Sequence, residues 1–193
     1  MNIKKEFSSL KGKGLEVQLN FRDIRFISNS AVKHPNCKFL IFGMGYDSLI
    51  WHKFNREGRT VFIEDDREWW DKINGFIPDI EAYLIKYHTK LCQWKELLDS
   101  PLKLKLDLPD TIINVKWDVI FVDGPKANSP ESPGRMSSIY MASRLIKDRG
   151  DIFVHDCNRE VEITYADKYL GEFRNQIRVR KLLRHYTHYD NQS

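Results

Sequence analysis

The stretch FLIFGMGYDSLIWHKF, residues 39–54, joins a short apolar run to a helical pattern through two glycines. An apolar run that ends in glycine is typical of a strand buried in a parallel sheet. Gly43 and Gly45 permit a sharp turn and let a ligand approach the backbone with no Cβ in the way. The helix that follows offers free N–H groups, and Asp47 or Ser48 can cap it or contact the ligand. The stretch therefore predicts a strand, a ligand-binding turn and a helix in succession.

The same alternation of strand and helix patterns extends along most of the chain. Strands are predicted at residues 37–43, 58–65, 82–89, 117–124, 150–156 and 182–189. Helices are predicted at residues 21–34 with Asn20 as N-cap, 47–55, 67–74, 132–147 with Pro133 in the first turn, and 159–170. This pattern favours an α/β fold with a doubly wound, mostly parallel, Rossmann-like sheet. We interpret residues 1–193 as a single domain, with an N-terminal helical extension over 1–36 and an α/β core over 37–187.

Composition argues against several classes of protein. The chain has 193 residues, of which 41% are hydrophobic and 30% charged, the balance of a soluble globular protein. Its net charge of +4 is too small to indicate nucleic-acid binding. The N-terminal segment MNIKKEFSSLKGKG contains no apolar core, and no run reaches transmembrane length. We therefore expect a cytoplasmic protein without nucleic-acid or membrane partners, and its oligomeric state stays open.

Polar residues follow four of the predicted strands at the points where they end. In a parallel sheet, ligands bind at the carboxyl ends of the strands, so these residues should meet at one edge. The four ends read Gly43-Met44-Gly45, Glu64-Asp65-Asp66, Asp123-Gly124 and His155-Asp156. Glu64, at the end of the second strand, is placed to accept hydrogen bonds from both hydroxyls of a ribose. The edge is therefore predicted to bind a nucleoside.

The charge of the glycine turn distinguishes between two kinds of nucleoside ligand. Ser48 stands where a dinucleotide-binding fingerprint has its third glycine. Asp47 would repel a pyrophosphate at the helix N-terminus. S-adenosylmethionine carries a sulfonium and an ammonium group instead, and both suit an acidic neighbour. The turn therefore favours S-adenosylmethionine, and with it a methyltransferase over a dehydrogenase.

Five segments carry a family resemblance: FLIFGMGYDSLIW, GRTVFIEDD, WDVIFVDGP, ESPGRMSSIYMASRL and DIFVHDCNREVEITYA. Together they resemble the plant family of glucuronoxylan 4-O-methyltransferases and the related irregular-xylem polysaccharide-biosynthesis proteins, over about residues 20–187. The resemblance implies a class I methyltransferase fold and methyl transfer from S-adenosylmethionine to the 4-hydroxyl of glucuronic acid on xylan. The plant enzymes are longer and carry an N-terminal membrane anchor that is not expected here. The fold and the donor therefore follow more directly than the acceptor, a carbohydrate or another small hydroxylated molecule.

The resemblance also implies roles for individual residues. The donor site would be formed by Gly43, Gly45, Asp47, Ser48, Glu64, Asp65 and Asp123, with Asp123 beside the reactive methyl. Residues 130–140 would form the acceptor-side loop and residues 155–160 the opposite wall. The acceptor side is basic, and a uronate carboxylate suits the bidentate fork of an arginine. Its predicted substrate-binding residues are Lys126, Arg135 and Arg159.

Methyl transfer to a sugar hydroxyl needs a general base or a metal ion, because the hydroxyl proton must leave as the new bond forms. Asp123, His155 and Asp156 are the candidate catalytic residues, and only His155 has an ordinary pKa near neutrality. Alternatively, Asp123 and Asp156 hold a divalent metal ion, with Asn158 near by, as in catechol-type methyltransferases. A helix cap at Asp156 is the structural alternative. The alternative functions are a lyase or cyclase that uses the same donor and a small-molecule O-methyltransferase.

Overall fold

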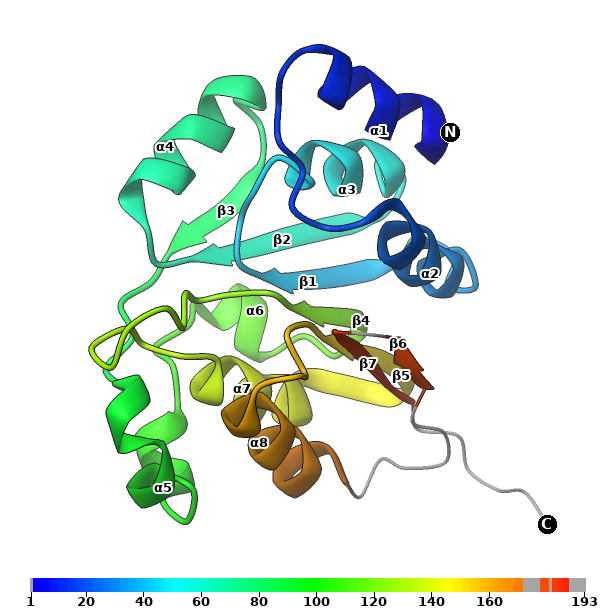
Figure 1. Ribbon diagram of the computed structural model, residues 1–193. Helices are drawn as coiled ribbons and strands as arrows, with labels where there is room; N and C mark the ends of the chain where they lie inside the picture. The colour runs from blue at the N-terminus through cyan, green and yellow to red at the C-terminus, as the bar shows by residue number, and fades with distance from the viewer. Residues whose placement is uncertain (1, 172–177, 181, 188–193) are drawn as a thin grey trace, which may run out of the picture.

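A seven-stranded sheet forms the centre of the computed structural model, which describes residues 2–171, 178–180 and 182–187 (Figure 1). The strands are β1 (Lys38–Phe42), β2 (Arg59–Glu64), β3 (Glu81–Leu84), β4 (Trp117–Val122), β5 (Ile146–Val154), β6 (Arg178–Arg180) and β7 (Leu183–Thr187). Their order in the sheet is β3-β2-β1-β4-β5-β7-β6. The strands β1 to β5 run parallel, whereas β7 is antiparallel to β5 and to β6. The predicted α/β class with a doubly wound, mostly parallel sheet is confirmed.

Helices cover both faces of this sheet (Figure 1). They are α1 (Ile3–Gly12), α2 (Phe21–Ala31), α3 (Ser48–Phe54), α4 (Arg67–Phe76), α5 (Trp94–Leu97), α6 (Asp110–Ile113), α7 (Met136–Leu145) and α8 (Glu160–Leu170). The first four contribute to one hydrophobic cluster and the last four to the other. Among the described residues, no helix combines the length and the apolar character that crossing a membrane requires.

The apolar run of β1 explains why the chain forms a sheet covered on both faces. Successive side chains of a strand point to opposite faces. Leu40 and Phe42 accordingly pack in the cluster with α5 to α8, and Phe39 and Ile41 pack in the cluster with α1 to α4. A strand buried on both faces needs apolar residues at every position. The sheet therefore continues outward from β1 through β2 on one side and β4 on the other.

The third strand is shorter than predicted. The last ladder bond at this edge runs from Ile85 N–H to the Glu64 carbonyl, 2.7 Å away. Beyond it the chain turns toward α7, where the Tyr87 hydroxyl lies 2.9 Å from Ser138 Oγ and Thr89 Oγ1 donates to the Pro133 carbonyl. The strand prediction for residues 85–89 is wrong, because side-chain contacts with α7 replace the ladder.

The predicted helix over residues 132–147 also begins later than expected. Gly134 has a φ of +68°, which a right-handed helix does not accept, and α7 starts at Met136. Pro133 therefore precedes the helix instead of lying in its first turn. At the other end of the chain, the predicted strand 182–189 is observed as β7, and its residues 188 and 189 lie outside the described residues.

Asp151, a buried residue of β5, connects this strand to α2 and to β7. Asp151 is 1% exposed and accepts a hydrogen bond from Ser30 Oγ on α2. His185 Nε2 on β7 lies 2.6 Å from Asp151 Oδ1, and His34 Nε2 lies 3.6 Å from Oδ2. Burial alone would raise the pKa of Asp151, but the hydrogen bonds from His185 and Ser30 outweigh it and lower that pKa. The helix α2, the residue His34 that follows it and the strand β7 thus all contact one buried charge on β5.

Candidate active site

A cavity of about 420 Å³ lies at the carboxyl ends of β1, β2, β4 and β5. Every residue predicted from the sequence to bind or catalyse lines it except Ser48: Gly43, Gly45, Asp47, Glu64, Asp65, Asp123, Lys126, Arg135, His155, Asp156 and Arg159. The strand-end rule thus brings together residues that are more than 100 positions apart in the chain.

The glycine loop after β1 is packed against the loop after β4. Gly43 has a φ of +105°, and a Cβ there would lie 2.8 Å from the backbone nitrogen of Gly124. A Cβ on Gly124 would in turn lie 2.6 Å from the Cα of Gly43. Both amides of the second loop, Asp123 N–H and Gly124 N–H, donate to the Phe42 carbonyl. Gly43 and Gly124 are therefore required for the contact between the two loops, whether or not a ligand is bound.

Asp47 and Ser48 stabilise the glycine loop from within. Asp47 occupies the N-cap position of α3, yet its side chain accepts from Trp51 Nε1 at 2.7 Å and caps no backbone N–H. Burial raises the pKa of Asp47 to about 6, and the charge of Asp123 adds to this effect. Ser48 is buried and its Oγ accepts from Gly45 N–H at 3.2 Å. The prediction of a side-chain cap by either residue is wrong, and ligand contact by Asp47 stays a prediction.

Glu64 connects the first two strand ends. Its Oε2 accepts from Met44 N–H at 2.6 Å, and its Oε1 accepts from the N–H groups of Asp65 and Asp66 at 2.9 and 2.8 Å. Burial raises the pKa of Glu64 to about 7, and these backbone hydrogen bonds offset only part of that effect. The carboxylate thus fixes the glycine loop relative to the end of β2, at the place where the sequence predicts the ribose.

Lys126 lines the cavity from the loop after β4 and contacts the loop after β2. Its Nζ pairs with the carboxylate of Asp66, which also caps α4 by accepting from Glu68 N–H at 2.9 Å. This pairing raises the pKa of Lys126 and lowers that of Asp66. The predicted substrate-binding side chain is therefore already paired with a residue of the loop after β2.

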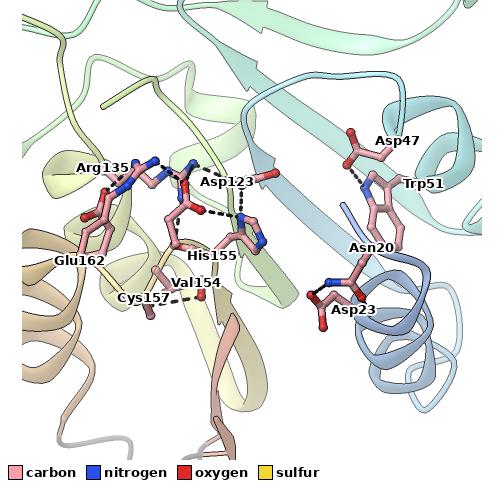
Figure 2. Close-up of polar contacts among 12 residues, drawn as sticks. Asn20, Asp23, Asp47, Trp51, Asp123, Arg135, Val154, His155, Cys157 and Glu162 are labelled. Carbon is pink, nitrogen blue, oxygen red and sulfur yellow. Dashed lines mark hydrogen bonds and ion pairs between the residues drawn. The ribbon is translucent and has the colours of Figure 1, made fainter. Parts of the chain in front are cut away.

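The three candidate catalytic residues form one cluster, of which Figure 2 labels Asp123 and His155. His155 Nδ1 lies 3.0 Å from Asp123 Oδ1 and 3.3 Å from Asp156 Oδ1. Burial lowers the pKa of His155, but its hydrogen bond to Asp123 and the two carboxylate charges outweigh this and raise it. Figure 2 shows that both contacts reach one nitrogen of the ring and that the other nitrogen faces away from the carboxylates.

Arg135 lies beneath the cluster. Its side chain is only 7% exposed, and its Nη2 is 2.9 Å from Asp156 Oδ2 and 3.3 Å from Asp123 Oδ1. Its Nη1 donates to the His155 carbonyl at 2.9 Å. Arg159 differs: its side chain is 42% exposed, although it also pairs with Asp156, at 3.1 Å. Of the two predicted acceptor-binding arginines, Arg159 has the guanidinium that remains more accessible to a ligand.

The donor atoms of the cluster fit a divalent metal ion. One ligand atom each from Asp123, His155 and Asp156 lies within 4.8 Å of the others. Two carboxylate oxygens with an imidazole nitrogen suit a transition metal such as manganese or cobalt better than magnesium or calcium. His155 is a further candidate ligand, which the sequence-based metal prediction omitted. Asn158 is exposed and does not line the cavity.

Sequence reasoning missed several residues of the cavity wall: Glu16, Gln18, Leu19, Tyr46, Trp69 and Asn128. Trp69 and Tyr46 are in edge-to-face contact, with ring centroids 5.4 Å apart. The neighbouring Trp70 instead points its indole N–H at the Ala82 carbonyl of β3. Adjacent helical positions face different sides, but the sequence gives no indication of which tryptophan faces the cavity.

Solved structures of low sequence identity share this fold. A SAM-dependent O-methyltransferase from Thermotoga maritima matches with a TM-score of 0.56 at 12% identity, over 100% of this chain and 73% of that one. An O-methyltransferase from Bacillus cereus, solved in complex with SAH, matches with a TM-score of 0.55 at 13% identity, over 96% and 90% of the two chains. These matches show the Rossmann-like fold of class I methyltransferases.

Closer relatives come from Arabidopsis thaliana. Glucuronoxylan 4-O-methyltransferase 3 is 36% identical over 192 residues, which cover 88% of this chain and 64% of that protein. Arabinogalactan O-methyltransferase 2 is 35% identical, over 80% of this chain and 62% of that protein. Protein IRREGULAR XYLEM 15 is 37% identical, over 79% and 55%. The chain spans less than two thirds of the length of each of these relatives.

The sequence profile of one family matches the chain in two overlapping parts, residues 22–104 and 99–186. The two parts include the glycine loop, Glu64, the candidate catalytic cluster and both arginines. With the relatives above, this match shows that the chain belongs to the IRX15/IRX15L/GXM family.

Proposed function

We propose that the protein is an S-adenosylmethionine-dependent O-methyltransferase whose acceptor is a sugar hydroxyl, most specifically the 4-hydroxyl of a glucuronic acid residue. The observation that carries this proposal is the cluster of Asp123, His155 and Asp156 beside the glycine loop in one cavity. The relatives named after glucuronoxylan and arabinogalactan methylation support a polysaccharide acceptor.

In this proposal the glycine loop, Glu64 and Asp65 hold the donor, and Asp123 lies near its methyl group. The acceptor oxygen attacks the methyl carbon in line, so that a C–O bond forms as the C–S bond breaks and S-adenosylhomocysteine leaves. The hydroxyl proton passes to the cluster formed by Asp123, His155 and Asp156. A divalent ion, if held by Asp123, His155 and Asp156, would polarise the acceptor hydroxyl. Arg135, buried beneath, holds the two carboxylates in position.

The test of the function is product analysis. The protein is incubated with S-adenosylmethionine and a glucuronic-acid-bearing xylo-oligosaccharide, and with an arabinogalactan fragment in parallel. Mass spectrometry should find the acceptor heavier by one methyl group in place of a hydrogen, with S-adenosylhomocysteine as co-product. A donor that fragments while the acceptor stays unchanged would instead identify a lyase or cyclase.

Glu64→Ala should weaken the binding of S-adenosylmethionine. Each hydrogen bond from a ribose hydroxyl to a carboxylate contributes about 1.5–3 kcal/mol. Because burial raises the pKa of Glu64 to about 7, the carboxylate becomes ionised as the pH rises through that value, and donor affinity should rise with it. Titration calorimetry at several pH values measures both effects. Glu64→Gln is the control that should bind weakly and lose the pH dependence near 7, and unchanged affinity in either variant would contradict the ribose assignment.

Arg159→Ala should raise the KM for a uronate acceptor and leave the affinity for the donor unchanged. The loss of a charge-assisted hydrogen bond should cost about 1.5–3 kcal/mol in kcat/KM. An acceptor whose carboxylate has been reduced to an alcohol should be affected little by the substitution. Arg144→Ala, at an exposed position late in α7, is the matched control. Equal rates for the acidic and the neutral acceptor in the wild type would show that the acceptor is not a uronate.

Removal of divalent ions tests the metal. A chelator should abolish turnover, and manganese or cobalt should restore it, because two carboxylates and an imidazole nitrogen are available as ligands. Full activity in excess chelator would contradict the metal site and leave the cluster acting as a plain base.

A further inference from the structure

The segment between α1 and α2 forms a wall of the cavity. Residues 15–20, LEVQLN, alternate apolar and polar side chains. Val17 and Leu19 are 7% and 2% exposed and belong to the hydrophobic cluster that covers β1. Glu16 and Gln18 are exposed, and both line the cavity. Val17 and Leu19 thus pack in the hydrophobic cluster while Glu16 and Gln18 stay exposed at the cavity, which Leu19 also lines.

This wall is held in place at both ends. After it, Asn20 caps α2 by accepting from Asp23 N–H at 3.0 Å. Before it, α1 is tied to α3 by the ion pair of Glu6 with Lys53 at 2.8 Å. The cap at Asn20, the ion pair of α1 with α3 and the burial of Val17 and Leu19 hold the backbone of residues 15–20 in place. This backbone carries Glu16 and Gln18.

Most other polar side chains of the cavity are already engaged. Asp47 bonds Trp51, Lys126 pairs with Asp66, and Arg135 spans the two catalytic carboxylates. Over the part of the chain that the structure describes, neither Glu16 nor Gln18 makes a hydrogen bond or an ion pair. Their hydrogen-bonding groups are therefore available to a ligand.

We propose that Glu16 and Gln18 are specificity-determining residues that bind the ring hydroxyls of the acceptor sugar next to the one that is methylated. The amide of Gln18 can donate and accept hydrogen bonds, and the carboxylate of Glu16 can accept them. A sugar hydroxyl can do both, so it can bond to either side chain. The charge of Glu16 repels a uronate carboxylate while that of Arg159 attracts it. Arg159 and the segment 15–20 together orient the sugar ring. Its carboxylate faces Arg159, next to α8, and its hydroxyls face residues 15–20. The inference rests on the proposed function.

The test separates acceptor binding from turnover. A glucuronic-acid-bearing xylo-oligosaccharide is titrated calorimetrically into the protein saturated with S-adenosylhomocysteine, for the wild type, Gln18→Ala and Glu16→Gln. Each substitution should weaken acceptor binding about tenfold, equivalent to roughly 1.4 kcal/mol. The affinity for S-adenosylmethionine, measured without acceptor, should stay within twofold of the wild type. Glu57→Gln, on an exposed side chain outside the cavity, is the matched control and should change neither.

Other outcomes identify which idea fails. A wild type that binds S-adenosylmethionine but no acidic or neutral sugar would overturn the proposed function, and this inference with it. If both variants bind the oligosaccharide as tightly as the wild type does, the inference is overturned and the proposed function is not. Loss of donor affinity in Gln18→Ala or Glu16→Gln would also overturn it, because the wall would then belong to the donor site.

Discussion

The Asp123→Asn variant is expected to lose about 10²–10⁴-fold in kcat, the range that general acid–base catalysis contributes. Asp123 Oδ1 is the atom that both His155 Nδ1 and Arg135 Nη2 approach, at 3.0 and 3.3 Å. An asparagine keeps the size of the side chain but removes the charge that holds these partners and would ligate a metal ion. Single-turnover measurement of methyl transfer, with donor and enzyme preincubated, isolates this effect from donor binding.

Asp148→Asn is the control for this substitution, because Asp148 is exposed and lies away from the cavity. Parallel measurements on His155→Gln and Asp156→Asn show which member of the cluster contributes most to the rate. If all three variants keep kcat within a few-fold of the wild type, proton transfer takes place elsewhere and the proposed site of chemistry is wrong.

Asp151→Ala should give the largest loss of stability. Removal of one partner from a buried charged cluster costs about 3–5 kcal/mol, because His185 and Ser30 lose their partner without access to water. At roughly 2–4 °C per kcal/mol for a chain of this size, the melting temperature should fall by roughly 6–20 °C. Thermal unfolding followed by circular dichroism measures the change. Asp148→Ala, on the same strand but exposed, should unfold like the wild type.

The contribution of Asp151 should also depend on pH with a definite sign. Its pKa is lowered in the folded state, so its stabilising effect is present above the ordinary aspartate pKa of about 3.9 and is lost as the pH falls through the folded-state value. The difference in stability between the wild type and Asp151→Ala should therefore shrink at acidic pH. A difference that stays constant through the acid range would show that the carboxylate acts without its charge.

The sheet and the floor of the site were predictable because both depend on local sequence. An apolar run followed by glycine, or by an acidic residue, marks a buried parallel strand and its ligand-binding end. The start of α7 was mispredicted because the positive φ of Gly134 leaves no mark in hydrophobic periodicity. The wall formed by residues 15–20 was missed for a different reason. Its alternation is visible in the sequence, but only tertiary packing places it across from β4 and β5.

The arginines show the same limit. Arg135 and Arg159 carry the same charge and were predicted alike for the acceptor. Their surroundings separate them, since the side chain of Arg135 is buried against the carboxylates of Asp123 and Asp156 and that of Arg159 is 42% exposed. Such a difference arises from contacts between β4, β5 and the helices that follow them, and composition or spacing does not encode it.

The backbone contact between Gly43 and Gly124 bears on which parts of the site can vary in sequence. The loop that is predicted to receive the donor and the loop that carries Asp123 touch there without any intervening side chain. The same contact restricts sequence drift, because a larger residue at either glycine would push both loops apart at once. Divergence within this family should therefore accumulate in the walls of the cavity, where the acceptor is proposed to bind, while the two glycines stay unchanged.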